Sequence, residues 1–252
     1  MSDIKNNLIA VKETLPPDVC LVAVSKFHPL SDLLEAYSAG QRVFGESRPQ
    51  ELHSKVVRLS SMGLEEPVVW HFIGHLQTNK LKLVLPYVSL VESVDSLSLL
   101  DAIESWAAAN PNPADCTQGG VTAAGNTIEA GRTQRTVRVL IELHISSEST
   151  KQGFTPQEAY ELLTGENRWP HVRFCGLMGM ASFTEDRSVI EADFKRLTSL
   201  FERLRPSVGK CPCLTEEFRE MSFGMSEDYK IAIEMGATIV RIGTSIFGPR
   251  RY

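Results

Sequence analysis

The chain has 252 residues, a length that fits one large α/β barrel or two small domains. Its 42% hydrophobic and 23% charged residues suffice for a sizeable core, which argues against overall disorder. The formal net charge of -5, without a dense basic stripe, argues against nucleic acid or an anionic membrane as the main partner.

Neither export nor a metal site is indicated by the sequence. The first residues lack the charged-then-apolar pattern of a signal peptide, and no apolar run approaches the roughly 18 residues that span a bilayer. The five cysteines are scattered and odd in number, as expected for free thiols in a reducing compartment. His71 and His75 have i, i+4 spacing, but a turn separates them, so we expect no metal pair. We therefore expect a cytoplasmic protein without a metal.

Short apolar runs alternate with segments of helical spacing along the chain. Ser31 and Ser226 are expected N-caps, and Thr155-Pro156-Gln157-Glu158 has the form of a capping box. We predict strands at residues 19–24, 43–46, 68–74, 87–91, 137–144, 172–178, 220–223 and 238–242. We predict helices at residues 4–14, 31–39, 48–60, 78–85, 96–109, from 155, at 186–205 and between 226 and 236.

Eight strands that alternate with helices predict a single (β/α)8 TIM barrel over residues 1–252. A doubly wound open sheet is the rival fold. Residues 110–135 are rich in Asn, Pro, Gly, Thr and Ala, and we expect a polar surface insertion there. Barrels commonly hold phosphate after strands seven and eight, where small residues cluster in this chain, and this favours the barrel.

The small residues after the last two strands could form a phosphate cup. Gly224 and Gly243 would let backbone amides approach an anion, and Ser226 and Thr244 could donate hydroxyl hydrogen bonds. Two ordinary strand-to-helix turns would use the same residues, and the pattern alone does not decide between these interpretations.

Lys26 ends the first apolar strand, where burial would lower its affinity for a proton and leave a nucleophilic amine. Such an amine can form a Schiff base with a carbonyl compound. The commoner case for a single lysine is a strand end that simply reaches solvent.

Arg241 stands between two apolar residues of the last strand and needs a partner. The partner could be Glu46, Glu92 or another acid, or a ligand. Pyridoxal 5'-phosphate (PLP) would connect the three features, because it carries an aldehyde for Lys26, a phosphate for the cup and a ring between them. An arginine at the ring nitrogen leaves that nitrogen unprotonated, which weakens the carbanion stabilisation needed for transamination or decarboxylation.

Several motifs in chain order resemble one family. They are Val22-Ala23-Val24-Ser25-Lys26, Phe44-Gly45-Glu46-Ser47-Arg48-Pro49-Gln50-Glu51, Trp70-His71-Phe72-Ile73-Gly74-His75-Leu76-Gln77-Thr78-Asn79-Lys80, Ser149-Thr150-Lys151-Gln152-Gly153-Phe154, Gly176-Leu177-Met178, Ser222-Phe223-Gly224-Met225-Ser226-Glu227-Asp228 and Val240-Arg241-Ile242-Gly243-Thr244-Ser245-Ile246-Phe247-Gly248. Together they resemble the pyridoxal phosphate homeostasis protein family, which is similar to the N-terminal barrel of alanine racemase. The resemblance covers nearly the whole chain.

The resemblance implies a Schiff base with PLP at Lys26, a phosphate site at Ser226, Gly243 and Thr244, and a ring contact from Arg241. We also include Ser47, Ser222 and Met225 among the candidate cofactor-binding residues. The family often has Asn and then an aromatic residue where this chain has Ser47 and Arg48, so an amide contact near the cofactor is in question.

Three functions fit this site. The first, implied by the resemblance, is PLP and amino-acid homeostasis, with the chain as a carrier or buffer of PLP without robust catalysis. In this case we expect PLP-dependent apoenzymes to receive the cofactor. We also expect the chain to be a monomer. The second is a PLP-dependent amino-acid racemase, which needs a second base. Its alanine racemase relatives take that base from an added β-domain, which we expect to be absent because the chain ends soon after the eighth strand. The third is a Schiff-base aldolase of sugar phosphates that needs no cofactor.

Overall fold

The computed structural model describes residues 3–111, 135–146 and 152–249, and within them eight parallel strands close into a barrel in chain order. The strands are β1 (Cys20–Val24), β2 (Val43–Glu46), β3 (Val69–Phe72), β4 (Leu90–Val94), β5 (Val137–Leu143), β6 (Val172–Gly179), β7 (Glu220–Ser222) and β8 (Ile239–Ile242). Because β8 pairs with β1, with Ala23 opposite Ile242, the ring is complete and the open-sheet alternative is excluded.

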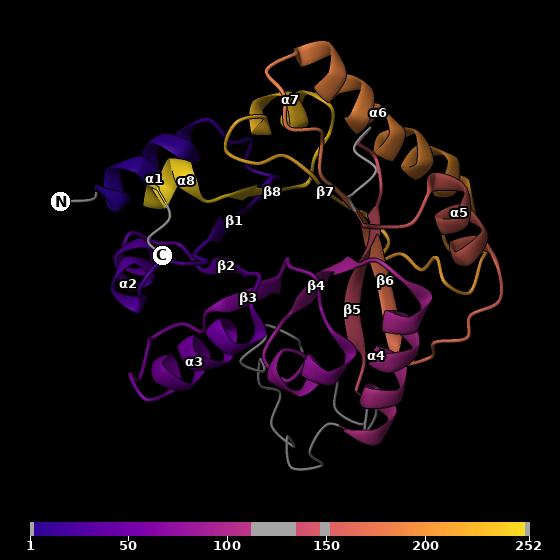
Figure 1. Ribbon diagram of the computed structural model, residues 1–252, viewed down its shortest axis with the longest axis horizontal. Coiled ribbons are helices and arrows are strands. Elements are labelled where there is room, and N and C mark those ends of the chain that lie inside the picture. Colours follow the sequence, from indigo (N-terminus) through magenta and orange to yellow (C-terminus); the bar gives the residue numbers. More distant parts are fainter. Residues whose placement is uncertain (1–2, 112–134, 147–151, 250–252) are drawn as a thin grey trace.

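Helices surround the strands (Figure 1). They are α1 (Ile4–Glu13), α2 (Leu30–Ser38), α3 (Pro49–Ser60), η1 (Thr78–Leu83), α4 (Leu97–Ala109), α5 (Pro156–Thr164), α6 (Arg187–Leu204), η2 (Arg205–Ser207), α7 (Tyr229–Glu234) and α8 (Thr244–Phe247). The first and last helices lie side by side, and the Asn7 side chain donates to the Ile246 carbonyl at 3.2 Å. The barrel predicted from the sequence is therefore confirmed.

Two hydrophobic layers hold the barrel together. The larger lies between strands and helices and includes Phe44, Phe72 and Phe174, each at most 1% exposed. The smaller fills the barrel interior with side chains such as Val22, Leu140 and Met178. Since side chains alternate between the two faces of a strand, a polar residue two positions after an interior residue also faces inward.

Several predicted boundaries are wrong. The N-cap of α2 is Pro29 instead of Ser31, because the fixed φ of Pro29, -66°, lets the helix begin at once. Residues 78–83 form a 3-10 helix that ends before Leu85. Asp228, not Ser226, is the N-cap of α7, and the Met225 amide donates to its carboxylate at 2.5 Å.

The fourth strand lies three residues later than predicted, at Leu90–Val94 in place of 87–91. Glu92 and Ser93 are therefore inside the strand, although the sequence placed them after it. By contrast, the capping box at Thr155 and Glu158 is present as predicted. The predicted insertion at 110–135 falls almost entirely outside the described residues. No helix among the described residues is long and apolar enough to cross a membrane.

Candidate functional site

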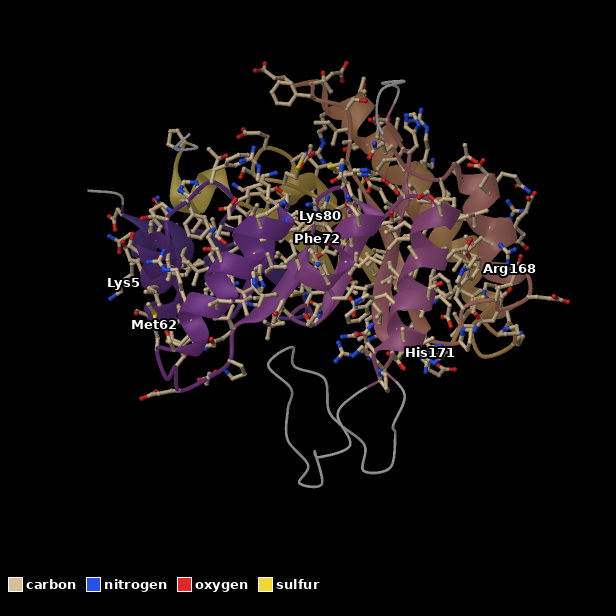
Figure 2. The ribbon with its side chains drawn as sticks, turned by 60° about the horizontal axis from the view of Figure 1, so that its bottom comes forward. Lys5, Met62, Phe72, Lys80, Arg168 and His171 are labelled. Atoms are coloured by element: carbon tan, nitrogen blue, oxygen red, sulfur yellow. The ribbon has the colours of Figure 1, made fainter. Side chains whose placement is uncertain are left out.

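The two ends of the barrel carry different side chains. Met62 and His171 precede β3 and β6 and lie low in Figure 2, whereas Lys80, which follows β3, lies higher. The residues that follow the strands therefore share one end of the molecule. In parallel barrels this end carries the functional groups.

Lys26 lies two residues beyond β1 and is partly buried. The next residue, Phe27, has a φ of 66° and is the one non-glycine residue with positive φ in the described part of the chain. Its amide donates to the Glu51 carboxylate at 2.9 Å, and the Arg48 guanidinium lies 4.1 Å from the centre of its ring. Arg48, which departs from the family pattern, thus covers the turn that contains Lys26.

The predicted phosphate cup brings the ends of β7 and β8 together. The Ser245 amide donates to the Ser226 hydroxyl at 3.4 Å, which joins the two loops. A Cβ at Gly243 would lie 3.2 Å from the carbonyl oxygen of Val24 in β1. Thr244 is exposed, and Ser226 is partly buried. The loops after β7 and β8 and the end of β1 are therefore direct neighbours.

Gly224 sets the path of the backbone below the cup. Its φ is 97°, and an added Cβ would lie 2.6 Å from the Cβ of Ala232. Its carbonyl accepts a hydrogen bond from the Arg241 amide at 2.9 Å. A side chain at this position would both strain the backbone and push α7 away from the loop.

Arg241 faces the barrel interior and is only 4% exposed. Its guanidinium donates to the Ser222 hydroxyl at 2.6 Å and to the Gly179 carbonyl at 3.0 Å. It also lies 3.7 Å from the Glu92 carboxylate. Of the acids that the sequence offered as partners, Glu92 is the one that pairs with Arg241. The Ser222 hydroxyl donates to Glu92 at 2.5 Å and so connects the two charges.

His71 completes this interior network, with its Nδ1 2.6 Å from Glu92. Burial alone would raise the pKa of Glu92, but the hydrogen bond and charge of His71, together with Arg241, bring that pKa below its ordinary value. Glu92 is therefore a carboxylate that carries its negative charge inside the barrel and orients Arg241 and His71.

Glu142 was not among the candidates that the sequence offered. It follows the interior residue Leu140 on β5 and is 6% exposed. Burial and then the charge of Asp95 raise its pKa to about 7, against the opposing effects of Arg241 and His75. A carboxyl group that exchanges a proton near neutral pH thus lies within the electrostatic influence of Arg241. The sequence signal that could have found Glu142 is its position two residues after Leu140 in the same strand, which places both side chains on the same face.

The remaining candidates lie at the rim. Met225 is 37% exposed. Ser47 is partly buried, and a Cβ at Gly74 would come within 2.3 Å of the Ser47 carbonyl oxygen, so the loops after β2 and β3 are in close contact. Among the described residues, no group of three or more His, Cys, Asp or Glu side chains is arranged to hold a metal ion.

Residues 1–251 match the family model described as the alanine racemase N-terminal domain. The pyridoxal phosphate homeostasis protein of Bos taurus is 39% identical over 238 residues, which cover 92% of this chain and 77% of that protein. The protein of the same name from Pasteurella multocida is 33% identical, with 96% and 92% coverage.

The chain belongs to the pyridoxal phosphate homeostasis protein family.

Solved structures of one protein are also similar to this chain. PipY from Synechococcus elongatus, solved without PLP, is 30% identical and superposes with a TM-score of 0.77, covering 98% of this chain and 100% of PipY. A second PipY structure, with PLP bound, gives a TM-score of 0.74. The family and the alanine racemase-like barrel inferred from the sequence motifs are confirmed.

Proposed function

We propose that this chain binds PLP through a Schiff base on Lys26 and acts in PLP and amino-acid homeostasis as a carrier or buffer without robust catalysis. The observation that carries the proposal is the position of Lys26, Ser226 and Thr244. They follow β1, β7 and β8, which are consecutive strands of the ring, at the same end of the barrel.

The chemistry of these residues fits the cofactor. An amine suits the aldehyde, and hydroxyl and backbone N–H donors suit the phosphate. Gly243 has no side chain where its backbone meets β1. A Cβ at this position would lie 3.2 Å from the Val24 carbonyl oxygen and would crowd the backbone there. We assign Ser47 and Met225 to the same site, and Ser222 to its inner end, where its hydroxyl accepts a hydrogen bond from Arg241. The names of the family's relatives and the PLP-bound PipY support this assignment.

Arg241 is the proposed partner of the ring nitrogen. When bound, PLP supplies an electron-withdrawing ring, whose strength depends on whether its nitrogen is protonated. Arg241 offers only N–H donors, and the ionised Glu92 carboxylate lies 3.7 Å from it. Such a partner favours an unprotonated ring nitrogen, which supports cofactor carriage more than demanding amino-acid chemistry.

Racemisation remains the second candidate, because the same lysine could serve as one of its two bases. A tyrosine as the other base lacks support. Each of the four described tyrosines contacts residues outside the barrel interior: Tyr37 bonds Glu66, Tyr87 packs on His53, Tyr160 on Arg203, and Tyr229 bonds Thr14. We further propose that the chain is a monomer and that PLP-dependent apoenzymes receive its cofactor.

The decisive experiment is the visible spectrum of the protein with PLP, followed by borohydride reduction and peptide mapping. We expect a coloured protein with reduced PLP on Lys26, and a folded but colourless Lys26→Ala variant. Lys230→Ala changes an exposed lysine of α7 and serves as the control, with colour retained. Label on another lysine would refute the assignment. Rapid exchange of the α-proton of amino acids by the coloured protein would favour the racemase instead.

A further inference from the structure

Lys55, on α3, is a buried lysine that the cofactor assignment does not use. Its side chain is 7% exposed, and its ammonium group makes three short hydrogen bonds. They run to the Ser25 carbonyl at 2.8 Å, to the Glu46 carboxylate at 2.7 Å and to the Glu51 carboxylate at 2.8 Å. The ammonium has three protons, so these contacts satisfy it completely.

The same cluster reaches the other side of Lys26. Glu51 accepts the hydrogen bond of the Phe27 amide at 2.9 Å, and Glu46 accepts that of the Ser25 hydroxyl at 2.6 Å. The Ser25 carbonyl and the Phe27 N–H belong to the two peptide groups that flank Lys26. Lys55, Glu46 and Glu51 therefore fix the backbone on both sides of this one residue.

The turn that they fix is unfavourable by itself. Phe27 has a φ of 66°, a left-handed conformation that is unfavourable for a bulky residue. Without its tethers, this turn would relax toward ordinary backbone angles and move the root of the Lys26 side chain.

Stability alone explains the cluster poorly. Glu46 is completely buried, one of its carboxylate oxygens has no hydrogen-bond partner, and burial raises its pKa. Burying two charges in this way gains little net free energy compared with apolar packing, and in some proteins such pairs serve to fix a geometry.

We propose that Lys55 is a positioning residue that holds the Lys26 amine in the geometry required for attack on the PLP aldehyde. This inference rests on the proposed Schiff base at Lys26. Lys55 does not itself contact PLP: it acts through the Ser25 carbonyl and, by way of Glu51, through the Phe27 amide.

The test compares the rate of PLP incorporation, followed by visible absorbance in excess PLP, with the urea midpoint of unfolding. The variants are Lys55→Met, Lys55→Arg, the double variant Glu46→Gln/Lys55→Met, and Glu51→Ala, which removes the acceptor of the Phe27 amide. The control is Glu104→Gln, which removes the negative charge from the 2.6 Å pair between Glu104 and His171 at the opposite end of the barrel.

We expect Lys55→Met to form the coloured species about tenfold to hundredfold more slowly, as for other small misplacements of a reacting group. Lys55→Arg should recover part of this rate. Glu46→Gln/Lys55→Met removes both charges, so its urea midpoint should move back toward wild type while its rate stays low. Glu51→Ala should also be slow, and Glu104→Gln should keep the wild-type rate even if it is destabilised.

Rates of Lys55→Met and Glu51→Ala within twofold of wild type would overturn the proposal. So would recovery of the wild-type rate in the double variant, because the defect would then come from the unpaired buried charge. If Lys55→Met does not fold, Glu51→Ala decides by the same criterion. Peptide mapping of the wild-type protein separates the two levels: label away from Lys26 refutes the proposed function, whereas label on Lys26 with unchanged variant rates refutes only the role of Lys55.

Discussion

The raised pKa of Glu142 predicts how the stability of the barrel changes with pH. In the unfolded chain this carboxyl group titrates near 4.5, and in the folded protein near 7. Below pH 4.5 it is protonated in both states and costs nothing. Between pH 4.5 and 7 the unfolded chain loses its proton first, so the folded state loses stability as the pH rises. The difference, at about 1.4 kcal/mol for each pH unit, amounts to roughly 3 kcal/mol above pH 7.

Glu142→Gln removes this titration while keeping the size of the side chain. We therefore expect the variant to gain stability relative to wild type as the pH rises from 5 to 8, by about 2.5 kcal/mol. The measurement is urea unfolding at several pH values, after hydroxylamine treatment and dialysis to remove any bound aldehyde.

The matched control is Glu166→Gln, because Glu166 is an exposed carboxylate after α5. Its free energy of unfolding should run parallel to that of the wild type across this pH range. A constant difference between Glu142→Gln and wild type from pH 5 to 8 would refute the reasoning, since Glu142 would then titrate alike in both states.

Further predictions concern the cup and the glycines. Ser226→Ala and Thr244→Ala should each weaken PLP binding roughly tenfold to hundredfold in an equilibrium titration, because a hydrogen bond to a charged group contributes about 1.5–3 kcal/mol; unchanged affinity in both would place the phosphate elsewhere. Gly224→Ala should lower the free energy of unfolding by at least about 1 kcal/mol, since its φ is 97°; an unchanged urea midpoint would show that the loop relaxes freely. Gly74→Ala should also lower the urea midpoint, because the added Cβ would lie 2.3 Å from the Ser47 carbonyl oxygen. A urea midpoint equal to that of the wild type would contradict this contact.

The sequence predicted the barrel because most strands are continuous apolar runs between helices of clear periodicity. It placed the fourth strand incorrectly because Glu92 interrupts the apolar run. In the structure Glu92 is tolerated inside the strand because Ser222, 130 residues away, and the neighbouring His71 and Arg241 satisfy its charge. Such pairing across a barrel leaves no local pattern in the chain.

The predicted starts of two helices were wrong for a related reason. Ser31 and Ser226 are both good N-cap residues, yet Pro29 and Asp228 take that position. Cap preference identifies several acceptable residues in a short segment, and the path of the loop selects among them. Likewise, the sequence around Lys55 indicates only an ordinary helix residue. The fold shows that Lys55 is buried against the turn that contains Lys26.

Closure of the ring between its first and last strands has a consequence for synthesis of the chain. The strand Cys20–Val24 leaves the ribosome well before its partner Ile239–Ile242, because the six other strands of the ring lie between them in the chain. Until β8 has been made, the β1 edge of the nascent sheet therefore has backbone groups without their final partners, and such edges are prone to pair with other chains. The nascent barrel is therefore open to misassembly at β1 until β8 emerges, and chaperone protection of β1 matters during this interval.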